Sequence, residues 1–164
     1  MSLWLRRVRI RRLKADDAAH WRDMRREALA ELPEAFGATH DDWAGRPLAD
    51  IASHLDDHCV FGAFRDEALI GTMALDCSDA AGEVSAVYVH PECRGKGIGR
   101  ALLKALSKEA RGRDLSQLML AVAETNVAAL RFYRGAGFSN SNQPSRALTR
   151  DGRLLDLVTM TKAL

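Results

Sequence analysis

The residues of this sequence with the clearest chemical role are three alternating glycines, Gly95, Gly97 and Gly99. Glycine adopts left-handed backbone conformations at no steric cost, so such a segment can curl until several N–H groups point into one hollow. A helix that begins there adds the positive end of its dipole. Mobile positive charge surrounds the stretch at Arg94, Lys96 and Arg100. The segment therefore predicts a binding site for a diphosphate.

Two common diphosphate ligands fit the spacing poorly. A nucleoside-triphosphate loop needs Gly-Lys followed by Ser or Thr, whereas Gly95-Lys96 is followed by Gly97 and offers no hydroxyl for magnesium. A dinucleotide fingerprint needs Gly-x-Gly-x-x-Gly, but Arg100 or Leu102 stands where its last glycine belongs. Both ligands are disfavoured.

The glycines lie between segments that predict a strand and a helix. Alternating side chains over Glu83–Val89 indicate a central strand, which Pro91 ends, and apolar spacing predicts a helix from about Ile98 to Arg111. A further strand is expected over Gln117–Ala123 and a further helix over Asn126–Gly135. Strand, loop and helix thus occur in the order that a diphosphate site requires.

The rest of the chain supplies supporting elements. Val8 and Ile10 indicate a first strand, with one solvated face, at a sheet edge, and Asp16 or Asp17 can cap a helix running to about Leu32. The stretch from Glu34 to Pro47 is typical of a loop. Later elements are expected as a helix over Leu48–Leu55, a hairpin of Cys59–Phe64 and Ala68–Leu75, a polar break over Asp76–Gly82, a return to the sheet from Gly137-Phe138, and a closing strand over Leu154–Met160.

At this point the sequence resembles the GCN5-related N-acetyltransferase (GNAT) superfamily, whose loop has the pattern Arg/Gln-x-x-Gly-x-Gly/Ala after a strand ending Val-x-Val-x-Pro. The matching residues are Val87-Tyr88-Val89-His90-Pro91 and Arg94-Gly95-Lys96-Gly97-Ile98-Gly99. A second family segment, Asn-x-x-Ala-x-x-x-Tyr-x-x-x-Gly-Phe, is matched by Asn126, Ala129, Tyr133, Gly137 and Phe138. The resemblance spans nearly the whole chain and is specific from about Glu83 to Phe138.

The resemblance implies a fold and a co-substrate. It implies one α/β domain over residues 1–164, with a mixed, mostly antiparallel sheet flanked by helices. The ligand it implies is acetyl-CoA, with the pyrophosphate on the backbone from Gly95 to Arg100, including Lys96 and Ile98. The pantetheine arm is expected to pair with the strand backbone at Val87 and Val89, where the sheet splays.

Acetyl transfer to an amine needs a base, because an alkylammonium is protonated near neutral pH, and usually an acid for the leaving thiolate. Tyr133 lies two helical turns after Asn126, so both side chains share one face of the helix. By the resemblance, Asn126 hydrogen-bonds the pantetheine and the Tyr133 hydroxyl protonates the sulfur. The alternatives left open are a core aromatic at Tyr133 and a helix N-cap at Asn126.

Glu83 is the first candidate for the base, acting directly or through water, and a solvated strand end is its alternative. Glu124 is the reserve candidate. Cys93 as a nucleophile and His90 as a base are disfavoured, since the resemblance implies direct attack in a ternary complex. Trp21, Phe36 and Trp43 could line an acceptor pocket, although core packing is the default for each. The amine acceptor itself cannot be identified from the sequence.

Composition excludes several other classes. With 47% hydrophobic and 28% charged residues, the chain of 164 residues is typical of one folded globular unit. No apolar run suggests a membrane span or signal peptide, so a cytoplasmic location is expected. Three separated cysteines and five histidines lack metal-ligand spacing, so no metal is expected.

Two rival functions remain, a nucleic-acid-binding protein and a non-catalytic acetyl-CoA-binding module. The run of basic residues from Arg6 to Lys14 could contact nucleic acid, but no stacking aromatics accompany it, so no nucleic-acid partner is expected. A non-catalytic acetyl-CoA-binding module stays open, because it would keep the loop and lack a working acid and base. A homodimer also stays open, although the sequence identifies no interface.

Overall fold

The computed structural model describes residues 2–31, 45–78, 80–148 and 152–164. Its centre is a seven-stranded sheet in the order β1-β2-β3-β4-β5-β7-β6. The strands are Val8–Arg12 (β1), Cys59–Arg65 (β2), Ala68–Ser78 (β3), Ala81–Val89 (β4), Gln117–Ala123 (β5), Ser139–Leu148 (β6) and Leu154–Ala163 (β7). β4 and β5 run parallel, and the other neighbouring pairs are antiparallel. The predicted mixed, mostly antiparallel sheet is confirmed, as is the position of β1 at an edge.

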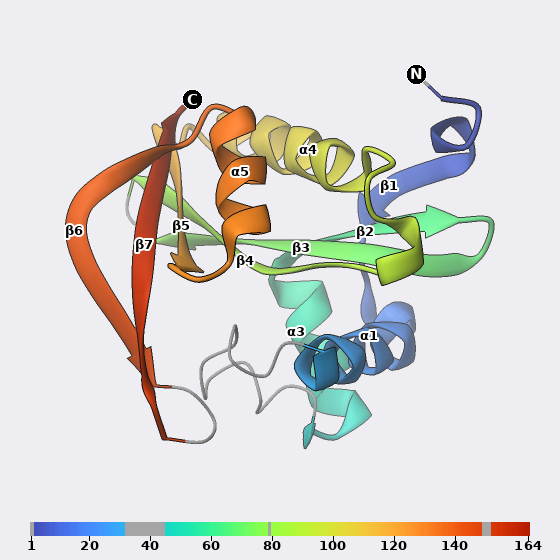
Figure 1. The fold of residues 1–164 in the computed structure, drawn as a ribbon. Helices are drawn as coiled ribbons and strands as arrows, with labels where there is room; N and C mark the ends of the chain where they lie inside the picture. The colour runs from blue at the N-terminus through green and yellow to red at the C-terminus, as the bar shows by residue number, and fades with distance from the viewer. Residues whose placement is uncertain (1, 32–44, 79, 149–151) are drawn as a thin grey trace.

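Helices cover both faces of the sheet. α1 (Ala18–Glu31) and α3 (Leu48–Asp57) lie on one face, and α4 (Ile98–Gly112) and α5 (Val127–Gly135) lie on the other (Figure 1). Short 3₁₀ turns occupy Leu5–Arg7, Ala15–Asp17 and Pro91–Cys93. The apolar stripe predicted for α4 is buried at Leu102, Leu103 and Leu106, and each such side chain contributes about 1.5–3 kcal/mol of transfer free energy. This burial anchors α4, and with it the glycine-rich loop, to the sheet.

Several predicted boundaries are wrong. β3 continues to Ser78 and β4 begins at Ala81, so most of the polar break expected over Asp76–Gly82 is paired strand, with Asp76 opposite Glu83. The return to the sheet predicted from Gly137-Phe138 is β6, for which the sequence predicted no end, and β7 runs three residues beyond the expected Met160. In each case cross-strand pairing overrides local polarity. The expected helix end at Leu32 and most of the Glu34–Pro47 loop lie outside the described residues.

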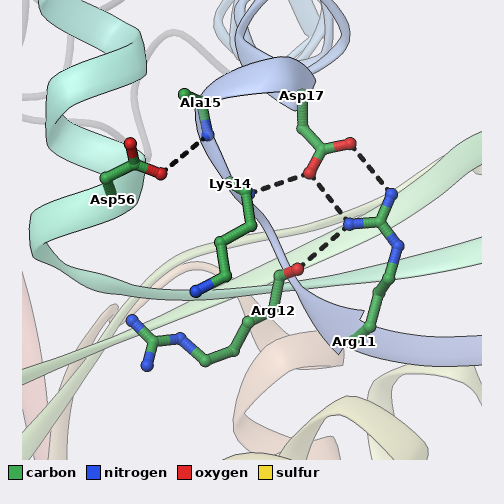
Figure 2. Close-up of polar contacts among 6 residues, drawn as sticks. All are labelled: Arg11, Arg12, Lys14, Ala15, Asp17 and Asp56. Carbon is green, nitrogen blue, oxygen red and sulfur yellow. Dashed lines mark hydrogen bonds and ion pairs between the residues drawn. The ribbon is translucent and has the colours of Figure 1, made fainter.

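A local hydrogen-bond network joins the first strand to the 3₁₀ turn before α1, and joins that turn to α3 (Figure 2). The Arg11 guanidinium donates to both carboxylate oxygens of Asp17 at 2.9 Å, and the Lys14 amide donates to Asp17 at 2.8 Å. The amide of Ala15 donates to Asp56 of α3 at 2.9 Å. The bond from Arg11 is the main cause of the lowered pKa of Asp17. Asp17 therefore reaches back toward the strand, and this arginine of the basic N-terminal run has a structural partner.

Candidate functional site

The parallel pairing of β4 with β5 is short. It joins Ala81, Gly82 and Glu83 of β4 to Gln117, Leu118 and Met119 of β5. On its other side β4 carries a bulge, since Thr72 pairs with Tyr88 while Ala74 pairs with Ser85. Ala86 within the bulge has a φ of 51°. A bulge turns a strand away from its neighbour, so beyond Glu83 the sheet opens between β4 and β5.

A cavity of about 820 Å³ occupies this opening. Its walls come from β4, the glycine-rich loop, β5, α5 and β7. The predicted site residues that line it are Glu83, Val87, Val89, Arg94, Gly95, Gly97, Ile98, Gly99, Arg100, Asn126 and Tyr133. Lys96 is not among its lining residues, and its Nζ lies 5.1 Å from the centre of the Trp4 ring. The structure therefore brings all the predicted site residues except Lys96 to one cavity.

The loop glycines meet two different requirements. Gly95 and Gly97 have φ values of 75° and 92°, in the left-handed region that favours glycine. Gly99 is needed for space, because a Cβ there would lie 3.1 Å from the Phe132 ring of α5. Gly97 immediately precedes the first residue of α4, and the amides of a helix's first turn have no partner within the helix. With the dipole, these amides make the loop an anion-binding end of the cavity.

Arg94 is held in place rather than mobile. One of its terminal nitrogens lies 2.6 Å from Glu31 of α1, and its Nε donates to the carbonyl of Val89 at 2.9 Å. The other oxygen of Glu31 accepts the Tyr88 hydroxyl at 2.6 Å. Arg94 is the main cause of the lowered pKa of Glu31, and burial, followed by the bond to Glu31, raises the pKa of Tyr88. The expectation of a mobile Arg94 is therefore wrong, because Glu31 uses it to tie α1 to the loop.

The end of β4 turns backbone groups toward the cavity. The amide of His90 donates to Ile70 of β3 at 2.9 Å, and successive strand residues direct their N–H and C=O groups to opposite sides. Val89, and by the same alternation Val87, therefore present these groups to the β5 side. The Val89 carbonyl already accepts a hydrogen bond from Arg94. The Val89 N–H and the N–H and C=O of Val87 therefore face the opening without that contact.

Asn126 and Tyr133 both lie on the side of α5 that lines the cavity. Asn126 is the N-cap, because its Oδ1 accepts the Ala129 amide at 3.2 Å. Tyr133 is 5% exposed and meets the rings of Phe132 and Phe138 edge-on. Burial raises the pKa of Tyr133, so its hydroxyl stays protonated at neutral pH. Each residue thus has a structural role as well as access to the cavity.

The remaining candidates differ in their access to this cavity. Glu83 is exposed and lines it where the β4–β5 pairing ends, and Cys93 also lines it. Glu124 is not among its lining residues. His90 lies 3.2 Å from Glu27 of α1. Trp21 is a 2% exposed core residue, and Phe36 and Trp43 lie outside the described residues.

Within residues 2–31, 45–78, 80–148 and 152–164, no helix is long and apolar enough to cross a membrane. In the same described ranges, no group of three or more His, Cys, Asp or Glu side chains could hold a metal ion.

Comparisons with known proteins agree with this geometry. Residues 20–138 match the acetyltransferase (GNAT) family. The chain is 32% identical over 152 residues to the L-methionine sulfoximine/L-methionine sulfone acetyltransferase of Pseudomonas aeruginosa, over 80% of this chain and 84% of that protein. It is 36% identical over 133 residues to the mycothiol acetyltransferase of Thermobispora bispora, over 75% of this chain but only 43% of that longer protein. Its fold is similar to that of an acetyltransferase from Salmonella typhimurium solved with acetyl-CoA, with a TM-score of 0.76 and 25% identity over 96% and 94% of the two chains.

Proposed function

The chain belongs to the acetyltransferase (GNAT) family, and we propose that it brings acetyl-CoA and a primary amine together where β4 and β5 separate. The observation that carries the proposal is the 820 Å³ cavity, which has an anion-binding loop at one end and a buried tyrosine in its wall. As a family member, the protein is an acetyl-CoA-dependent N-acetyltransferase. The residue assignments below are our proposal.

The cavity suits coenzyme A in charge and in shape. The amides from Gly95 to Arg100 hold the diphosphate, with Arg100, and with Lys96 from outside the cavity wall, adding positive charge. The Val89 amide and the backbone of Val87 pair with the pantetheine arm as they would with a strand. The Asn126 side chain donates to the same arm through its amide nitrogen, since its oxygen caps α5.

When bound, acetyl-CoA supplies an acetyl thioester, which the amine nitrogen attacks to form a C–N bond as the C–S bond breaks. Tyr133 gives its proton to the departing thiolate, and burial keeps that proton on the hydroxyl until it is needed. Glu83 takes the proton from the amine, directly or through water, at the solvent-accessible end of the cavity.

The domain organisation, the location and the partners of the protein stay predictions. We propose that residues 1–164 form a single domain in the cytoplasm and act without a metal or nucleic-acid partner. Formation of a homodimer stays open. The named relatives act on different acceptors, so their names do not identify the amine used here.

Two measurements test the proposal. Titration calorimetry should show CoA binding, and release of CoA thiol should follow addition of amines from a broad panel. Binding without thiol release from any amine would instead support the non-catalytic module.

The base is tested with a matched pair of variants. Glu83→Gln should lower kcat/KM by about 10²–10⁴-fold. Glu124→Gln, the control, should retain most of the activity. The opposite result would transfer the role to Glu124.

A further inference from the structure

The large cavity reaches both faces of the sheet. Val158 of β7 packs against the core cluster that holds Tyr133 of α5, so its side chain points to the side of α4 and α5. Successive residues of a strand point to opposite faces. Leu155 and Leu157 therefore point to the side on which α1 and α3 lie (Figure 1). Because these leucines and Tyr133 all line the cavity, the cavity passes through the sheet where β4 separates from β5.

The part of the cavity that β6 and β7 form is apolar. Leu155 pairs with Ala147 of β6, and cross-strand partners point to the same face. Ala147, Leu155 and Leu157 are half-buried and line the cavity, and we call them the apolar wall. The ion pair of Arg146 with Asp156, at 2.9 Å, lies on the opposite face by the same alternation. The charges of that pair therefore point away from the apolar wall.

The groups proposed to hold acetyl-CoA lie on the other face. The glycine-rich loop leads directly into α4, and Gly99 adjoins α5. Asn126 and Tyr133, proposed for the pantetheine and the thiolate, belong to α5 as well. With the cofactor on that face, the amine reaches the thioester from the side of α1 and α3. The group attached to the amine nitrogen is then left beside the apolar wall.

We propose that the acceptor is a small primary amine with an aliphatic or aromatic group, and that this group packs against the apolar wall. The proposal rests on the acetyltransferase function proposed above. Moving an apolar group out of water stabilises the complex. A second ammonium in the same place would lose hydration beside three side chains that offer it no hydrogen-bond acceptor. The apolar wall therefore selects against polyamines and amino sugars, which carry polar groups along their length.

The wild-type protein provides the first test, with two series of amines that grow by methylene groups. One series runs from ethylamine to hexylamine, and the other from alanine to norleucine. We expect kcat/KM to rise about fourfold for each added methylene until the apolar wall is covered. Each series ends in a matched pair, in which an ammonium replaces the terminal methyl of the same skeleton: hexylamine with 1,5-diaminopentane, and norleucine with ornithine. The apolar member should be preferred by at least about tenfold.

The outcomes of this test separate the two proposals. Release of CoA thiol at equal kcat/KM along both series would overturn the apolar contact and leave the acetyltransferase function standing. A preference for the charged member of both pairs would do the same. No thiol release from any amine, despite measured acetyl-CoA binding, would overturn both proposals.

Variants of β7 provide the second test. Leu157→Ala should lower the ratio of kcat/KM for norleucine to that for alanine about tenfold. Leu157→Asp places a carboxylate in the apolar wall and should reverse the preference within each matched pair. Leu154→Ala is the matched control and should keep the wild-type ratio, because Leu154 is 67% exposed and is not among the lining residues of the cavity.

Calorimetry on the same variants distinguishes an acceptor contact from a cofactor contact. The Kd for acetyl-CoA should stay within about threefold of wild type in Leu157→Ala. Weaker acetyl-CoA binding together with an unchanged norleucine-to-alanine ratio would assign the apolar wall to the cofactor, and would overturn the inference.

Discussion

Replacing Tyr133 with Phe separates the acid role from the packing role, because it removes one hydroxyl and keeps the ring. We expect kcat to fall by about 10²–10⁴-fold. Stability should change little. Tyr133 lines the large cavity, and its hydroxyl is not among the buried polar atoms that lack a partner, so removing it should change the free energy of unfolding by less than about 0.5 kcal/mol. For a chain of this size Tm should stay within about 2 °C of wild type.

Tyr88 is the other tyrosine of the chain and the natural comparison. Its hydroxyl donates to Glu31 at 2.6 Å, and the Glu31 side chain is 29% exposed. A hydrogen bond to a charged group contributes about 1.5–3 kcal/mol, and we take the lower end because solvent reaches Glu31. Tyr88→Phe should therefore lower Tm by about 3–6 °C. Both variants remove a tyrosine hydroxyl, and only Tyr88→Phe should lower Tm.

The assay is thiol release at saturating acetyl-CoA and amine, beside calorimetric melting of the same preparations. The acid assignment fails if Tyr133→Phe keeps kcat within about threefold of wild type. It also fails if kcat falls only in step with a drop in Tm, because the hydroxyl would then be structural.

The remaining predictions concern the loop and pH. Gly97→Ala places a side chain on a residue with a φ of 92°, which costs about 1–2 kcal/mol. Calorimetry should therefore show CoA binding weakened about tenfold. Gly112→Ala is the control, because it lies at the other end of α4 with open space around its Cβ, and it should leave CoA binding unchanged. Similar Kd values for the two would contradict the role given to the loop. Tm of the wild type should fall as pH drops from 6.5 toward 4, since the pKa of His54 is 6.5 in its ordinary state but about 4 when folded, so the unfolded chain takes up the proton first. His54→Gln should flatten this fall, and equal slopes for the two proteins would disprove the shift.

The elements around the loop could be predicted because their signals are local. Alternation over β4, the glycines and the leucines of α4 each specify their own segment, and β5 was predicted with its observed ends. The start of β6 is predictable from Gly137-Phe138, but its length carries no such signal, because Ser139–Leu148 is rich in Ser and Asn and holds a proline. It forms a strand through pairing with β7, which no window of its own sequence reveals.

The site residues also differ in how far they could be predicted from the sequence. The residues of the two motifs were expected to meet, because the resemblance implies that both bind acetyl-CoA. The bond from Arg94 to Glu31 joins positions far apart along the chain, and only the packing of α1 on β4 creates it.

The opening between β4 and β5 also affects which amino-acid substitutions this protein can tolerate. Its rims beyond Glu83 offer peptide groups, and a peptide group survives every exchange of side chain except one to proline, which deletes the N–H. Substitutions at positions such as Val87 can change the side chains of the cavity wall while the backbone N–H and C=O groups stay in place. The protein can thus vary its choice of amine while the frame for the thioester arm persists.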